Sequence, residues 1–87
     1  MPCYLVEWYH SAATEEPLDD TAARLKDSAV LMSEHGSTVR LLNLLAVPTD
    51  EVLFAVFTAD SASAVEETCD QAGIPAQRVS TATEVDL

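Results

Sequence analysis

Residues 39–58 read VRLLNLLAVPTDEVLFAVFT, two apolar runs separated by a short polar turn, and this stretch decides the fold. Pro48 has the backbone φ that the second position of a type I turn requires, and Asp50 tolerates turn geometry, so the stretch predicts a β-hairpin. Side chains alternate between the two faces of a strand, and here both faces are apolar. In the first run, Leu42 and Leu44 point to one face and Leu41 and Leu45 to the other. In the second, Phe54 and Val56 point to the face opposite that of Leu53 and Phe57. The hairpin therefore needs two covering layers.

A strand and a helix are expected before the hairpin. Residues 3–9 are aromatic and β-branched, which predicts a strand with Tyr4, Val6 and Trp8 on one face. A loop is expected over residues 10–16, and a helix from Pro17 to the stop at Gly36. Its apolar stripe consists of Leu18, Ala22, Leu25, Ala29 and Met32.

A second helix and a last strand are expected after the hairpin. Asp60 or Ser61 caps the helix, and Ser63 with Glu66 is an alternative capping box. The helix carries Cys69 on its buried stripe and ends before Gly73 and Pro75. Residues 77–85 predict the strand, with Val79, Thr81, Thr83 and Val85 on one face.

This order of elements, β-α-β-β-α-β, predicts an α+β fold of the ferredoxin-like type over a single domain, residues 1–87. Connection rules place both helices on one face of a four-stranded antiparallel sheet. The chain then has nothing left to cover the other face, although the hairpin is apolar there. We therefore expect a homodimer formed through that face.

Fifteen acidic residues stand against four basic ones, giving a net charge of -11. Nucleic acids and anionic membrane surfaces require basic residues, so neither is expected as a partner of this acidic protein. The start of the chain has no basic region of a signal peptide, and no apolar run approaches the length that spans a bilayer, which predicts a cytoplasmic protein. Cys3 and Cys69 have the spacing of neither a zinc site nor a disulfide framework.

No catalytic signature is present, so candidate residues are considered singly. Glu7 is the single charge in the first strand and must reach the rim, find a partner or bind a ligand. His10 directly follows the predicted strand, and its imidazole can share a metal ion or a proton with Glu7. Cys69 lies among acidic residues, which raise the pKa of a thiol. The acidic run Glu15, Glu16, Asp19 and Asp20 matches no calcium loop and predicts a solvated helix start.

Two segments resemble a family of small bacterial proteins of unknown function, some of which are called nickel-binding proteins. They are the opening Tyr4-Leu5-Val6-Glu7 and the run Ala72-Gly73-Ile74-Pro75-Ala76-Gln77-Arg78-Val79 with Glu84-Val85. The resemblance implies a ferredoxin-like dimer and a possible metal site that includes Glu7. The chain departs from the family pattern where members often carry histidine, asparagine, cysteine or polar residues. Those positions are here Leu44, Leu45, Ala55 and Cys69.

Two functional hypotheses follow. In the first, a dimer binds nickel or zinc without catalysis, through Glu7, His10 and Cys69. In the second, the protein resembles dimeric α+β barrels and is a small-molecule enzyme or binder with Glu7 as general base in an apolar pocket. That pocket is expected to contain Glu7, Trp8, Tyr9 and Phe54. A third alternative is a module that only dimerises; the metal, substrate and reaction stay open.

Overall fold

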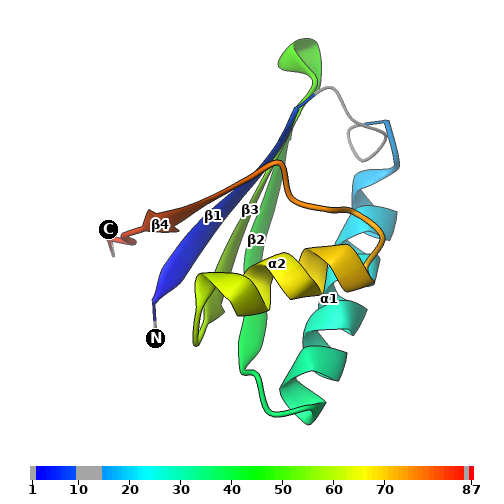
Figure 1. Ribbon diagram of the computed structural model, residues 1–87. Coiled ribbons are helices and arrows are strands. Elements are labelled where there is room, and N and C mark those ends of the chain that lie inside the picture. Colours follow the sequence, from blue (N-terminus) through cyan, green and yellow to red (C-terminus); the bar gives the residue numbers. More distant parts are fainter. Residues whose placement is uncertain (1, 10–14, 86) are drawn as a thin grey trace.

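The strands and helices follow one another in the predicted order. The computed structural model describes residues 2–9, 15–85 and 87. Its elements are β1 (Cys3–Tyr9), α1 (Leu18–Glu34), β2 (Val39–Val47), a 3-10 turn η2 (Pro48–Asp50), β3 (Val52–Ala59), α2 (Ala62–Gln71) and β4 (Arg78–Ala82). The strands form one sheet in the order β2-β3-β1-β4, and every neighbouring pair is antiparallel. Both helices cover the same face of this sheet (Figure 1). The ferredoxin-like α+β fold is therefore confirmed.

The hydrophobic core lies between the sheet and the helices. On β1 the side chains of Tyr4, Val6 and Trp8 are buried, as the alternation predicts, whereas the intervening residues are partly exposed. The same alternation holds along β3, where Leu53 and Phe57 are buried. Trp8 also donates its indole N–H to the backbone oxygen of Ile74 at 3.1 Å, which satisfies the polar atom of a buried side chain. This side of the sheet is filled by side chains.

A β-bulge in β2 changes the predicted facing of its leucines. The pairing with β3 shifts between Leu41 and Asn43, so that Leu42 is the extra residue and is 40% exposed. Leu41 and Leu44 consequently both pack against the core, whereas the sequence pattern placed them on opposite faces. A regular alternation cannot reveal an inserted residue, and this part of the prediction was wrong.

The buried stripe of α1 also differs from the predicted one. Leu18 is 41% exposed, and two polar residues, Thr21 and Ser28, are buried in its place. Their hydroxyls are satisfied: Thr21 donates to the Glu16 carboxylate at 3.1 Å, and Ser28 donates to the backbone oxygen of Thr68 at 2.6 Å. Because burial of a hydroxyl is tolerated when it is hydrogen-bonded, hydrophobicity alone misplaced the edge of the stripe.

The last strand is shorter than predicted. β4 ends at Ala82, which pairs with Cys3, the first residue of β1. Val85 lies beyond the strand and is 72% exposed. Since β1 is the neighbour of β4 in the sheet, the ladder ends where β1 begins, and the prediction that residues 83–85 continue the strand was wrong.

Each helix ends at a glycine with a left-handed backbone conformation, at Gly36 (φ 97°) and Gly73 (φ 77°). Next to Gly73, Arg24 of α1 donates to the backbone oxygen of Ala72 from Nε at 3.1 Å and from Nη2 at 2.6 Å. Arg24 also pairs with Glu16, which precedes α1. One side chain thus joins the C-terminal end of α2 to α1.

Neither described helix has the length and apolar character of a membrane span.

We expect Gly73→Ala to destabilise the protein more than Gly36→Ala. The left-handed conformation costs a non-glycine residue about 1–2 kcal/mol at either site. At Gly73 an added Cβ also lies 2.9 Å from Arg24 Nη2, whereas nothing lies within 4 Å at Gly36. Urea denaturation of both variants measures the difference. Equal losses for the two variants would show that the Arg24 contact can give way without cost.

Candidate functional site

The sheet face that the helices leave uncovered, here called the open face, carries the half-buried Glu7. Alternation and strand register assign the face these positions: Cys3, Leu5, Glu7 and Tyr9 on β1, Arg40, Asn43, Leu45 and Val47 on β2, Val52, Phe54, Val56 and Thr58 on β3, and Arg78, Ser80 and Ala82 on β4. Glu7 pairs with Phe54 on one side and with Arg78 on the other. Its side chain is only 12% exposed even in the single chain.

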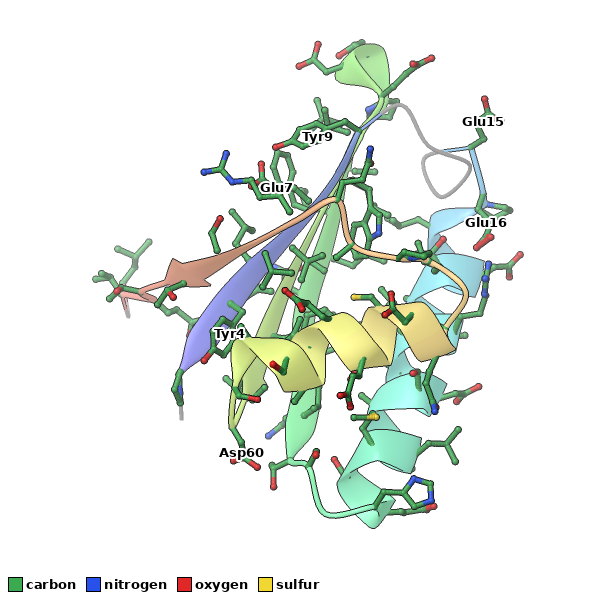
Figure 2. The ribbon with its side chains drawn as sticks, in the orientation of Figure 1. Tyr4, Glu7, Tyr9, Glu15, Glu16 and Asp60 are labelled. Carbon is green, nitrogen blue, oxygen red and sulfur yellow. The ribbon has the colours of Figure 1, made fainter. Side chains whose placement is uncertain are left out.

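Glu7, Tyr9 and Arg78 form a group that we call the polar cluster. The Tyr9 hydroxyl donates a hydrogen bond to Glu7 Oε1, and Arg78 Nε lies 3.6 Å from Glu7 Oε2. Figure 2 shows Glu7 and Tyr9 together near the end of β1. The two carboxylate oxygens thus have different partners, which fixes the orientation of the carboxylate.

The backbone around the cluster is held by Gln77, the residue before β4. Its N–H donates to the Glu7 backbone oxygen at 3.2 Å, and its side-chain Oε1 accepts from the Tyr9 N–H. These bonds continue the β1–β4 ladder past Arg78. The three side chains of the cluster therefore project from two strands that are hydrogen-bonded to each other. Binding groups are held most precisely on such rigid elements.

The hydrogen bond to Glu7 raises the pKa of the Tyr9 hydroxyl, with smaller contributions from burial and from the charge of Glu7. Arg78 acts in the opposite direction, because its positive charge favours the phenolate. Tyr9 is therefore a neutral hydrogen-bond donor across the physiological pH range. It keeps Glu7 oriented without adding charge to the open face.

The second sequence hypothesis placed Glu7, Trp8, Tyr9 and Phe54 in one pocket. The structure brings Glu7, Tyr9 and Phe54 to the open face. Trp8 lies on the opposite face, 1% exposed, in the filled core beneath the helices. Three of the four residues are therefore neighbours, and the space between sheet and helices at Trp8 is occupied by packed side chains.

The first hypothesis placed Glu7, His10 and Cys69 around a metal ion. Cys69 is fully buried on α2, on the side of the sheet that the helices cover. Glu7 stands on the other face, so the sheet separates the two residues. His10 lies outside the described residues. Among the residues that the structure describes, no three of the histidine, cysteine, aspartate and glutamate side chains gather as metal ligands. One chain does not bring Glu7 and Cys69 to a common ion.

Burial raises the pKa of the Cys69 thiol to about 12, with added repulsion from Asp70 and Glu66. Because the thiolate is the nucleophile and the metal-ligating form, Cys69 is unreactive at neutral pH. In Cys3→Ser, which leaves Cys69 as the remaining thiol, we expect no modification by iodoacetamide in the native state and full modification after unfolding in urea. Rapid native-state labelling at pH 8 would contradict the burial of this thiol.

Two hollows in the described part of the surface are lined by none of the three residues of the polar cluster. One is lined by Glu16, Leu18, Ala46, Pro48, Glu51, Val52 and Leu53. The other, an open groove, is lined by Ala22, Lys26, Leu41, Leu42, Asn43 and Leu44. Neither hollow contains a residue that sequence reasoning selected as a ligand or catalytic group.

Charge is distributed unevenly over the molecule. At the open-face positions Glu7 is the one acid, whereas Arg40 and Arg78 are two of the four basic residues of a chain with net charge -11. The remaining acids of the described part include the exposed Glu66, Glu67 and Asp70 on α2. The open-face positions named above thus carry one of the fifteen acidic residues and two of the four basic ones.

Comparisons with known proteins extend the fold assignment. No protein-family model matches the chain, and no match was found among curated proteins. The crystal structure of SCO4226 from Streptomyces coelicolor A3(2) is similar, with a TM-score of 0.74 over 97% of this chain and 99% of that one. At 13% sequence identity this likeness shows the fold alone. Membership of the family with nickel-binding members stays a prediction.

Arg78 is the member of the cluster to which sequence reasoning gave no role in a site. The signal was present in the strand register. If residues 3–9 and 78–82 pair as neighbouring antiparallel strands, Glu7 stands opposite Arg78. Opposite charges that stand across from each other on paired strands attract, so this register would have predicted the ion pair.

Proposed function

We propose that the protein is a homodimer that binds a small molecule, with the open face as the dimer interface and the polar cluster as the recognition site. One observation carries the proposal: a half-buried carboxylate, held by a tyrosine and an arginine, lies on an apolar sheet face that the helices leave uncovered. Burying a charged group is costly unless its partners or a ligand repay the lost hydration.

The composition of the open face favours a second copy as its cover. Apolar side chains from the three strands β1, β2 and β3 stand on it, and Leu45 is 58% exposed in the single chain. Monomers rarely expose large continuous apolar areas. Two acidic chains repel one another, so contact is least costly where acidic groups are fewest. The open face meets both conditions.

The position of the polar cluster favours a ligand at the rim of that interface. β4 is an edge strand, and the Arg78 side chain on it is 67% exposed. The cluster therefore borders both the apolar centre of the open face and the surrounding solvent. Binding sites commonly combine an apolar wall with a few fixed polar groups in this way.

A nickel or zinc site stays a prediction that requires a different ligand set. Arg78 beside Glu7 places a positive charge where a metal ion would bind, which opposes binding of a cation. Cys69 is neutral and buried on the other side of the sheet. A calorimetric titration of chelator-stripped protein with nickel and zinc is expected to give weak heats that Glu7→Gln does not alter.

The proposal is tested by an NMR screen of a small-molecule library with labelled protein. We expect the amide signals of Glu7, Tyr9 and Arg78 to shift with binding compounds, and Glu7→Gln to weaken that binding. Glu67→Gln serves as the matched control, because Glu67 is an exposed glutamate on α2. Hits that cluster on other surfaces, or hits indifferent to Glu7→Gln, would contradict the proposed site.

A further inference from the structure

We propose that residues 83–87 of a second copy dock in the open groove between α1 and β2. This contact rests on the homodimer proposed above and adds a second point of attachment between the two copies. It involves neither the polar cluster nor the apolar centre of the open face. Three features of the molecule lead to it: the lining of the groove, the character of residues 83–87, and the reach of the chain.

The groove combines apolar walls with one positive charge. Three leucines of β2 line it together with Ala22 and Lys26 of α1, and no acidic residue does. Leu42, the extra residue of the bulge, is 40% exposed there, and β2 is an edge strand with a neighbour on one side only. In the described part of the chain Arg24 and Arg78 have acidic partners, whereas Lys26 lies in no ion pair. The groove thus suits a segment that is both apolar and acidic.

Residues 83–87, here called the tail segment, read TEVDL and have this character. Val85 is 72% exposed and Leu87 is fully exposed, which makes them the most exposed large apolar side chains of the described residues. In an extended chain, residues two positions apart point the same way, so both side chains can enter one groove. Their neighbour Glu84 supplies a negative charge for Lys26. The groove and the tail segment are therefore complementary in both respects.

The groove of a chain lies beyond the reach of its own tail segment. Ala82, the residue before the tail segment, ends β4 (Figure 1), whereas the groove borders β2 at the opposite edge of the sheet. The two edges are three strand spacings apart, about 14 Å. Five extended residues span at most about 17 Å, so a path around the sheet leaves no length to lie in the groove. The occupant must come from another chain.

A copy packed against the open face can supply its tail segment. The strand registers place Ala82 and Arg40 in the same row across the sheet, so the tail segment begins at the end of the sheet where β2 starts. If the two-fold axis runs along the strands, the β4 edge of each copy lies opposite the β2 edge of the other. Packed sheets are about 10 Å apart, which five residues can cross.

The test is an NMR titration of the labelled full chain with a synthetic peptide of residues 81–87 whose ends are blocked. The protein carries Val56→Glu, which disrupts the open face and leaves the groove unchanged. We expect saturable shifts of the amide signals of Lys26 and of residues 41–44. Lys26→Gln should weaken binding about two- to fivefold, the effect of one exposed ion pair. A peptide with serine in place of Val85 and Leu87 should not bind.

Cross-linking examines the same contact without a substitution on β3. Two proteins that both carry Cys3→Ser are mixed in oxidised glutathione, one with Leu42→Cys and the other with Val85→Cys. Cys69 is buried and does not interfere. We expect the mixed disulfide to form severalfold faster than in a control mixture, where Glu67→Cys on the exposed surface of α2 replaces Leu42→Cys.

Several results would overturn the inference. Absence of saturable shifts at the groove, or binding that the serine peptide retains, would exclude recognition of the tail segment. Equal rates in the two mixtures would mean that the disulfides form by random collision. If the peptide binds but sedimentation shows a monomer, the groove contact stands and the open-face dimer is wrong. If a dimer forms and the peptide does not bind, the dimer stands and this inference fails.

Discussion

Replacing Val56 by glutamate should convert the proposed dimer into a monomer. Val56 stands on the open face in the middle of β3 and pairs with Leu5 of β1 and Asn43 of β2. In a two-fold dimer the substitution places two carboxylates in an apolar contact between chains that already carry a charge of -11 each. We expect the dissociation constant of the dimer to rise by about 100-fold or more, since buried unpaired charges are strongly unfavourable. Sedimentation velocity over a concentration series measures the change.

Val30→Glu is the matched control for this prediction. Val30 lies on α1, is 57% exposed, and undergoes the same chemical change away from the open face. We expect this variant to associate like the unmodified protein, apart from a small effect of one added charge. If both variants dissociate to the same degree, net charge and not the open face governs association. If neither dissociates, the chains meet through another surface.

Replacing Phe57 by alanine should remove about 3–5 kcal/mol of folding free energy. Phe57 is fully buried on the helix-covered face of the central strand β3. It pairs with Tyr4 of β1 and with Leu41 of β2, so its ring is surrounded on both sides. A loss of this size is a large part of the stability of a small domain, and the variant is expected to be close to unfolding at 37 °C. Urea denaturation followed by circular dichroism provides the measurement.

Phe54→Ala is the internal comparison, because Phe54 lies on the same strand but on the open face. In the Val56→Glu background, where dissociation does not contribute, we expect it to cost far less folding free energy than Phe57→Ala. In the unmodified background it should weaken the dimer. Equal losses from the two alanine variants in the monomer would mean that the two faces of β3 are equally buried within one chain, contrary to the structure.

Much of the architecture could be predicted because it depends on short segments of the sequence. The alternation of Tyr4, Val6 and Trp8 with partly exposed neighbours survives intact in β1. Ser61 caps α2 by accepting from the Ala64 N–H at 3.2 Å, which is one of the predicted alternatives. Gly36 ends the first helix in the left-handed conformation that its position predicted. Each of these features depends on residues that are only a few positions apart in the sequence.

The features that escaped prediction depend on contacts between distant segments. The bulge at Leu42 appears only when β2 is laid against β3. The burial of Ser28 depends on the Thr68 backbone oxygen, forty residues away. The partnership of Glu7 with Arg78 depends on the register of β1 with β4. The metal-site hypothesis grouped Cys69 with Glu7 because both side chains can bind a metal ion. The topology of the fold puts the sheet between them.

The most direct test of the central proposal is sedimentation equilibrium of the unmodified protein at low and high salt. We predict a species of twice the 9.4 kDa chain mass at micromolar concentration, with tighter association at high salt, because salt screens the repulsion between two acidic chains. A single species of 9.4 kDa at every concentration and salt would contradict it, because the open face would then be free of a second copy.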